Sequence, residues 1–228
     1  MAEQSMEARM AIMEKEVERL KAIEAIRKVE HAYSYYLLMW MHQEIIDLFA
    51  VRDDTTLEWP QGIFIGKEAP RQYFSHMNPN KDPEFMHQMM HLSDVIDIAE
   101  DGNTGQGRWW GFGAMALPKA DKGVTQAYGC GIYENDFIKE DGVWKLWKIR
   151  WVHQYSSKPT DGWVKPERVS EFRPSAEGEH GLPDWWKVAK PPKGIDYSYP
   201  SGYIFPFHFN HPVTGKPTTE GEWNARLK

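Results

Sequence analysis

Apolar residues near the start of the chain recur with a helical period, separated by charged residues. Their spacing alternates between four and three residues, at Met6, Met10, Met13, Val17 and Leu20. This pattern predicts an amphipathic helix with coiled-coil character, packed on its own domain or on a neighbouring subunit. A second helical stretch, about 23–38, follows with hardly a break, and a shorter helix is expected over about 43–49.

The period changes near residue 55, and the rest of the first two thirds of the chain is typical of strands. Short strands are expected at 55–59 and 63–65, followed by a helix over 67–76. Four long candidate strands come next, at 86–99, 104–117, 125–139 and 144–155. Turn sequences such as Asp101-Gly102 and Asp141-Gly142 separate them and favour hairpins. Helices followed by strands predict an α+β domain, with a curved antiparallel sheet packed on the N-terminal helices.

The last part of the chain has a different texture. Ten of the 15 prolines lie after residue 155, together with many aromatic residues. A disordered tail would be poor in aromatics. We therefore expect two regions: a helical N-terminus and sheet domain over 1–157, and a long irregular C-terminal arm over 158–228. The arm is expected to pack on the domain or on a neighbouring subunit, and it could close one end of a pocket.

Composition narrows the class of protein. Aromatic residues make up 14% of the chain, and the net charge of −6 argues against a nucleic-acid partner. The single cysteine, Cys130, excludes an internal disulfide framework and a multi-cysteine zinc site. No apolar run is long enough to span a membrane, and the first residues lack the apolar core of a secretory signal. These features predict a cytoplasmic enzyme or binding protein.

Four short segments appear in an order that resembles a known fold family. They are Ile23-Glu24-Ala25-Ile26 leading to Tyr33, Met86 to His91, Gly107-Arg108-Trp109-Trp110, and Asp141-Gly142-Val143-Trp144. Over residues 10–157 the chain resembles the cone-shaped nuclear transport factor 2-like fold, and within it the SnoaL-like group of scytalone dehydratase, bile acid 7α-dehydratase and ketosteroid isomerase. The resemblance implies a deep pocket between the concave sheet face and the N-terminal helices, suited to a flat apolar ligand.

The same resemblance suggests which residues carry chemistry. Tyr33 and His91 fall where the bile acid dehydratase family has its catalytic tyrosine and histidine, and His153 falls where it carries an arginine. We predict these three as catalytic, because histidine and tyrosine side chains can move protons to and from a substrate oxygen. The residues predicted to bind substrate are His87, Trp109, Tyr133, Asn135 and Trp151.

Two departures from the dehydratase family change the expected chemistry. The register places Leu38 where the family has an acidic residue in the first helix, and Gly113 where it has the aspartate that partners the histidine. The strand 104–117 contains no acid. The sequence thus predicts that the histidine lacks its carboxylate. No metal is expected, because no glutamate follows His87 as a helical zinc motif requires, and no phosphate or dinucleotide loop appears, so no cofactor is expected.

Without that carboxylate, proton abstraction from an alcohol O–H is easier to support than abstraction from carbon. The chain also resembles lignin diarylpropane γ-formaldehyde lyases of the SnoaL-like group. This resemblance implies a cofactor-independent lyase that converts an aromatic diol into a stilbene, formaldehyde and water. Two alternatives are a dehydratase or isomerase of a polycyclic substrate, using an acid such as Asp53, Asp54 or Glu58, and a non-catalytic binding protein. The expected partners are a small aromatic substrate and further copies of the chain, as a dimer or trimer.

Overall fold

A computed structural model of the chain describes residues 5–38, 40–76, 85–118 and 123–160. The N-terminal region forms a single helix, α1 (Met6–Leu38), of 33 residues instead of two stretches. No glycine or proline occurs before Trp59, so the backbone has nothing to break the helix. Trp40 then adopts a positive φ of 50°, and the short helix α2 (His42–Asp47) follows.

The strands form one curved sheet of six, in the order β2-β1-β6-β5-β4-β3. The short pair is β1 (Thr56–Trp59) and β2 (Gly62–Ile65), followed by helix α3 (Ala69–Phe74). The long strands are β3 (Met86–Ile98), β4 (Thr104–Pro118), β5 (Val124–Glu140) and β6 (Val143–Ser157). They are joined as antiparallel neighbours, so the predicted α+β fold and its four long strands are confirmed.

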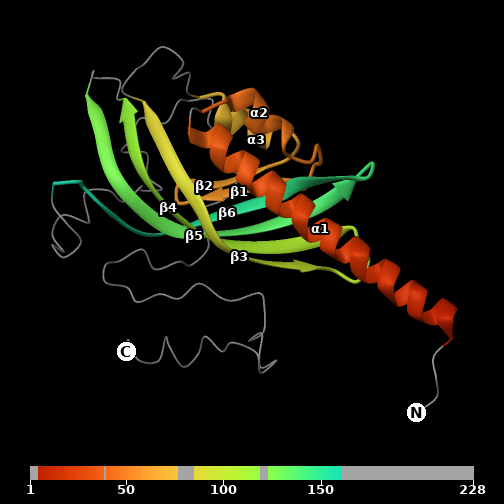
Figure 1. Cartoon of the computed structure of the whole chain (residues 1–228). Coiled ribbons are helices and arrows are strands. Elements are labelled where there is room, and N and C mark those ends of the chain that lie inside the picture. The colour runs from red at the N-terminus through yellow and green to blue at the C-terminus, as the bar shows by residue number, and fades with distance from the viewer. Residues whose placement is uncertain (1–4, 39, 77–84, 119–122, 161–228) are drawn as a thin grey trace, which may run out of the picture.

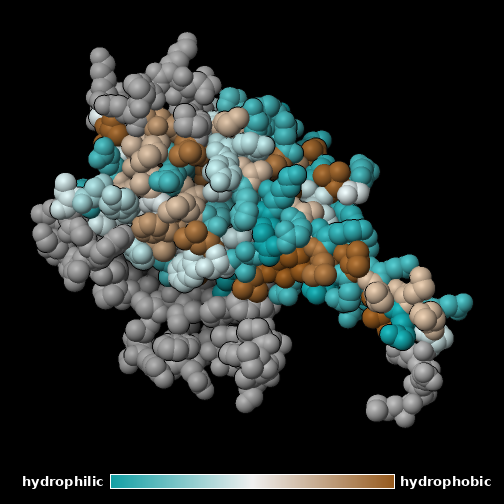
Figure 2. All heavy atoms as spheres, in the orientation of Figure 1, coloured by the Kyte–Doolittle hydropathy of each residue, from teal (hydrophilic) through white to brown (hydrophobic). Residues whose placement is uncertain are grey.

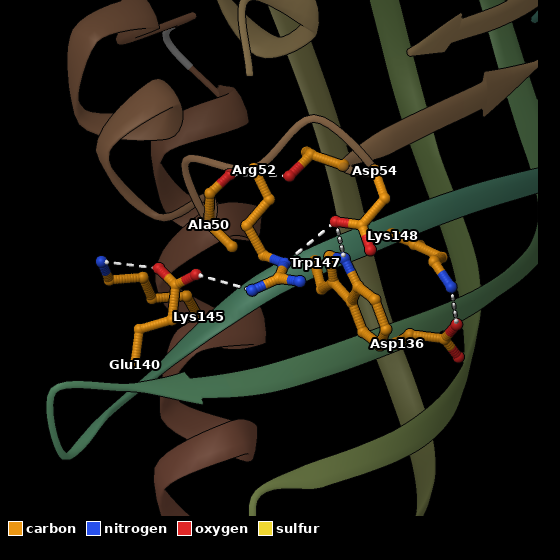
Figure 3. Close-up of polar contacts among 9 residues, drawn as sticks. Ala50, Arg52, Asp54, Asp136, Glu140, Lys145, Trp147 and Lys148 are labelled. Carbon is orange, nitrogen blue, oxygen red and sulfur yellow. Dashed lines mark hydrogen bonds and ion pairs between the residues drawn. The ribbon is translucent and has the colours of Figure 1, made fainter. Parts of the chain in front are cut away.

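The short pair joins the sheet through β1, which runs parallel to β6. The loop before β1 is fixed to the β5–β6 hairpin by polar contacts (Figure 3). Asp54 accepts hydrogen bonds from Arg52 at 2.9 Å and from the Trp147 indole at 3.1 Å, and Arg52 also lies 3.8 Å from Glu140. This attachment holds β1 and β2 beside the long strands, where they form one end of the concave surface.

Only the C-terminal half of α1 packs against the sheet, whose concave side curves around it (Figure 1). The buried residues of this helix share one stripe, at Ala22, Ile26, Glu30, Tyr33 and Leu37. The stripe faces the sheet and includes one carboxylate, Glu30. The predicted arm beyond residue 160 lies outside the described residues. None of the described helices is both long and apolar enough to cross a membrane.

Candidate active site

A cavity of about 240 Å³ lies between the end of α1, helix α3, the β1–β2 hairpin and the concave sheet face. Its walls are mostly aromatic: Tyr33, Trp40, Trp59, Tyr73, Phe74, Tyr133 and Trp151 all line it. Three histidines, His76, His87 and His153, add polar groups to this lining. A mostly apolar pocket with a few polar groups is the usual form of a small-molecule site.

Glu30 and His91 form a buried pair at the base of this region. Glu30 Oε1 lies 2.7 Å from His91 Nδ1, and neither side chain is exposed to solvent. The carboxylate favours the tautomer with its proton on Nδ1, which leaves the lone pair on Nε2. Nδ1 makes a close ion-pair contact with Glu30 that lies outside hydrogen-bond geometry, and Nε2 is buried without a hydrogen-bond partner among the described residues. This geometry suits a histidine that accepts a proton from a ligand.

Asn135 of β5 contacts the Glu30 carboxylate from the sheet side. Its Nδ2 donates to both carboxylate oxygens of Glu30, each at 3.0 Å. Its Oδ1 accepts the backbone N–H of Arg150 at 3.2 Å, which fixes the orientation of the amide. The amide therefore presents its donor, not its acceptor, to the carboxylate. Asn135 does not line the cavity, and its side chain contacts Glu30 and the backbone of Arg150.

Two phenols lie between His91 and the cavity. The Tyr133 and His91 ring centroids are 4.1 Å apart, and those of Tyr33 and His91 are 5.5 Å apart. The Tyr33 and Tyr133 hydroxyls share a hydrogen bond. Burial raises the pKa of both phenols well above the usual value, so both remain protonated donors near neutral pH. His91 itself is not part of the cavity lining.

His91 and His153 lie at opposite ends of one row across the sheet. The register pairs His91 with Gly111, Gly111 with Gly131, and Gly131 with His153. Three strand spacings separate the two histidine backbones, or roughly 14 Å along the sheet. The two rings cannot contact each other, so each would address a different part of a bound ligand.

The two glycines of this row make room for the pocket wall. A Cβ at Gly131 would lie 2.6 Å from the Trp151 ring and 2.5 Å from the Val152 carbonyl. A Cβ at Gly111 would lie 2.4 Å from the Trp151 ring and 2.9 Å from the Tyr133 ring. The indole therefore lies directly over backbone, with its centroid 4.6 Å from that of Tyr133. The space left by these glycines is filled by wall residues.

Burial controls the charge of the histidines that line the cavity. It lowers the pKa of His87 to about 4 and that of His153 to about 4, so both are neutral near pH 7. The Nδ1 of His87 and the indole nitrogen of Trp59 are buried without a hydrogen-bond partner in the described part of the chain. Both residues line the cavity, so both atoms are candidates to bind polar groups of a ligand.

The structure brings most of the predicted site residues together. Tyr33, His87, Tyr133, Trp151 and His153 line the cavity. His91 lies directly behind the two phenols. Trp109 is fully buried against Phe137, with ring centroids 5.9 Å apart, and like Asn135 it lies outside the lining. The roles assigned to these residues stay predictions.

The prediction that the histidine lacks a carboxylate is wrong. Glu30 of α1 supplies it, whereas the family register placed the partner of the histidine at Gly113 of β4. A signal was present in the sequence: Glu30 continues the apolar stripe of Ala22, Ile26, Tyr33 and Leu37. A carboxylate on the buried face of a helix indicates a buried partner, since an unpaired buried charge is costly.

Comparison with known proteins agrees with this architecture. The family model of the SnoaL-like domain matches residues 18–150. Hexachlorocyclohexane dehydrochlorinase LinA-type3 from Novosphingobium barchaimii LL02 superposes with a TM-score of 0.51 at 16% identity, covering 66% of this chain and 99% of that one. A putative scytalone dehydratase from Novosphingobium aromaticivorans DSM 12444 gives 0.49 at 20% identity, covering 65% and 92%. No curated protein matches the chain.

At 16% identity the LinA-type3 structure speaks only to the fold. The described residues contain no group of three or more histidine, cysteine or acidic side chains placed to hold a metal ion.

The family match is the stronger of the comparisons, because it spans more than half of the chain and both partners of the Glu30–His91 pair. The chain belongs to the SnoaL-like domain family.

Proposed function

We propose that the protein is a cofactor-independent lyase that acts on a hydroxylated aromatic substrate. The observation that carries this proposal is the buried Glu30–His91 pair, with a 2.7 Å contact, next to a cavity with aromatic walls. A histidine oriented by a carboxylate is a competent general base near neutral pH. Aromatic walls select a flat substrate, and the two phenols supply donors for its oxygen atoms.

The substrate hydroxyl enters between Tyr33 and Tyr133 and replaces their mutual hydrogen bond. Its oxygen then accepts from one phenol, and its proton passes to His91 Nε2, which has no other partner among the described residues. Glu30 stabilises the imidazolium that forms. The aromatic ring of the substrate packs against Trp151 and Tyr133, which contact each other.

In its finer form, the proposed substrate is a lignin-derived diarylpropane diol. Once His91 has taken the proton of the primary alcohol, the carbon–carbon bond to that carbon breaks and formaldehyde leaves. The released electron pair forms the new C=C bond and expels the benzylic hydroxyl, which takes up the proton held by His91 and departs as water. The remaining product is a stilbene, and no oxidant or reductant is needed.

The size of the cavity is compatible with this class of substrate. An apolar cavity of about 150 Å³ can hold one benzene molecule. A volume of about 240 Å³ therefore has room for one substituted ring and the carbons of the propane chain, with the second ring toward the opening. Neutral His87 and His153 then serve as hydrogen-bonding groups for ring substituents rather than as charged residues.

Simple dehydration is the second candidate, and Glu30 is the observation that favours it. The sequence argument against proton abstraction from carbon rested on a missing carboxylate. With Glu30 in contact with His91, the same base could abstract a C–H proton while a phenol assists the leaving hydroxyl. Such an enzyme would release water but no formaldehyde.

One assay separates these candidates. Purified protein is incubated without added cofactor with diarylpropane diols and with hydroxylated polycyclic compounds, while ultraviolet spectra and formaldehyde are recorded. A stilbene spectrum with equimolar formaldehyde supports the carbon–carbon lyase. New conjugation without formaldehyde supports the dehydratase. Ligand binding with no turnover in the wild type would overturn the catalytic proposal and favour a binding protein.

The role of His91 is tested with the His91→Gln variant. It should lose at least tenfold in turnover, because a general base contributes roughly 10²–10⁴-fold to rate. A matched control is His31→Gln, since His31 lies on the same sheet-packed half of α1 as Glu30 but is exposed. Full activity in His91→Gln, with an unchanged circular dichroism spectrum, would contradict the assignment.

A further inference from the structure

The N-terminal half of α1 carries an apolar stripe that nothing in the described structure covers. The stripe consists of Met6, Met10, Met13, Val17 and Leu20, whose exposed fractions are 69%, 54%, 66%, 47% and 54%. Every buried residue of this helix lies in its other half, from Ala22 to Leu37. Figure 1 shows that the N-terminal half extends beyond the sheet, and Figure 2 shows apolar side chains on this projecting end.

The stripe and the buried residues lie on opposite sides of the helix. At about 100° per residue, the direction of the stripe differs by about 160° from that of the residues packed on the sheet. A second helix placed along the stripe would therefore lie on the side away from the sheet of its own chain. The body of the domain does not obstruct this surface.

The stripe has the spacing of a two-stranded coiled coil. Met6, Met13 and Leu20 occupy d positions, and Met10 and Val17 occupy a positions, over just more than two heptads. Such a length is marginal for isolated helices, because nucleation is costly. Here α1 is already formed and anchored by its buried half, so that cost has been met before association.

The charges beside the stripe are complementary to those of an identical, parallel helix. In a parallel pair, each g residue meets the e residue five positions later on the other chain. Arg9 at g would face Glu14 at e of the second copy, and Glu16 at g would face Lys21 at e. Both pairs are attractive, and each occurs twice in a dimer.

Two of these flanking residues, Glu16 and Lys21, are exposed and take part only in ion pairs within the helix. Glu16 lies 3.0 Å from Arg19, and Lys21 lies 2.8 Å from Glu18, within the same helix. Their side chains remain 55% and 68% exposed. Exposed ion pairs of this kind contribute at most about 1 kcal/mol, so they can exchange for contacts between chains.

From these observations we propose that residues 6–20 of α1 form a parallel coiled coil with a second copy of this chain. The stripe supplies the apolar seam, and the flanking charges set the parallel orientation. The two sheet domains then lie on opposite outer sides of the seam. The inference does not depend on the proposed catalytic function.

Light scattering coupled to size-exclusion chromatography tests the seam on the full chain. The wild type should have the mass of a dimer, and Val17→Glu should have the mass of a monomer. The matched control is Ile12→Glu, because Ile12 is 52% exposed on the same segment but lies off the stripe at a c position. This control should stay dimeric. A monomeric wild type, or a dimer that Val17→Glu does not weaken, would overturn the proposal.

Two further variants test the orientation. Arg9→Glu should weaken the dimer at least severalfold, and the double variant Arg9→Glu, Glu14→Arg should restore it, because the pair is only reversed. In Met13→Cys, the d-position thiols of two parallel helices face each other and should form an intermolecular disulfide under mild oxidation. Absence of both the rescue and the disulfide in a dimeric protein would exclude the parallel arrangement.

Discussion

Glu30 of α1 contacts His91 of β3 across the boundary between helix and sheet, with 2.7 Å between Oε1 and Nδ1. The contact joins two elements that are distant in sequence, and Asn135 reaches the same carboxylate from a position 105 residues further along the chain. One helix, α1, and two strands, β3 and β5, thus meet at the buried Glu30 carboxylate. Burying a charged group of this kind costs free energy unless it is paired. A cluster that is nevertheless buried beside a cavity is therefore a candidate functional site.

Replacing Glu30 by Gln tests whether this charge supports catalysis. Gln keeps the size of the side chain but removes the negative charge that would stabilise an imidazolium at His91. We expect turnover to fall by at least tenfold, and by the order of 10²-fold where proton transfer limits the rate. The measurement is kcat in the assay for the lyase reaction.

The control for this substitution is Glu24→Gln on the same helix. Glu24 is 70% exposed and pairs with Arg27, away from the site. It should leave turnover unchanged. Equal activity of Glu30→Gln and Glu24→Gln would show that the carboxylate has only a structural role.

Much of the fold could be predicted from the sequence, because its local signals agree with the final structure. The predicted strand 86–99 is β3, Met86–Ile98, and the predicted strand 104–117 is β4, Thr104–Pro118. Alternating apolar residues and Asp-Gly turns determine these boundaries locally. The placement of His87, Met89 and His91 on one face of β3 follows from the same alternation.

The site was harder to predict because it depends on contacts between distant elements. The family register places the partner of His91 in β4, yet the carboxylate comes from α1. Asn135 shares a face of β5 with Tyr133, and alternation alone does not show that its side chain contacts Glu30. Strand alternation gives the face of the sheet on which a residue lies; it does not give the depth of that residue beneath a packed helix.

The neutral histidines of the cavity predict how stability depends on pH. The pKa of His87 and that of His153 are each lowered to about 4 by burial, whereas the unfolded chain protonates histidine near pH 6.5. The unfolded state therefore binds more protons below that pH, and the free energy of unfolding should fall as the pH drops from about 6.5 to 4. Each histidine contributes a loss of up to about 1.4 kcal/mol per pH unit in this window.

Urea unfolding measured between pH 4 and 8 checks this expectation. The loss should be smaller in His153→Gln, which cannot take up the proton in either state. His31→Gln, with an exposed side chain, should follow the wild type. An unfolding free energy that is flat from pH 7 to pH 4.5 would contradict the buried, neutral state of these histidines.

Alanine at Gly131 should damage the pocket wall. The added Cβ would lie 2.6 Å from the Trp151 ring and 2.5 Å from the Val152 carbonyl, so the indole must move toward the cavity. We expect ligand affinity to fall at least tenfold, and stability to fall by roughly 1–3 kcal/mol, as overpacking usually costs.

Gly129→Ala, two residues earlier on the same strand, is the matched control for Gly131→Ala. Its Cβ would meet only the flexible end of Met115, at 3.0 Å; Met115 lines the cavity but can shift, so ligand affinity should fall much less than in Gly131→Ala. Both affinities can be measured by quenching of tryptophan fluorescence with a diarylpropane diol. Equal affinity in the two variants would show that the position of Trp151 does not shape the binding site.

Asn135→Asp replaces the donor that holds Glu30 with a second acceptor. The new carboxylate at position 135 can still accept the hydrogen bond from the backbone N–H of Arg150. It would lie about 3 Å from the Glu30 carboxylate in a buried site, where the two groups cannot both stay ionised. One of them must keep a proton, so its pKa in the folded state is raised above that of the unfolded chain. The stability penalty relative to the wild type should therefore be small below pH 4 and grow as the pH rises to 7.5, reaching roughly 2–4 kcal/mol.

The turnover of Asn135→Asp also shows whether Asn135 acts on the charge of Glu30 or only packs against it. A proton shared by the two carboxyls weakens the negative charge that faces His91, so turnover should fall more steeply than stability accounts for. Asn103→Asp, at an exposed turn far from Glu30, should leave turnover unchanged, and its effect on stability is confined to the contact of Asn103 with Asp101. If the penalty of Asn135→Asp did not change between pH 5 and 7.5, the Glu30 carboxylate would not be the charged partner of His91, and the basis for the proposed base would be lost.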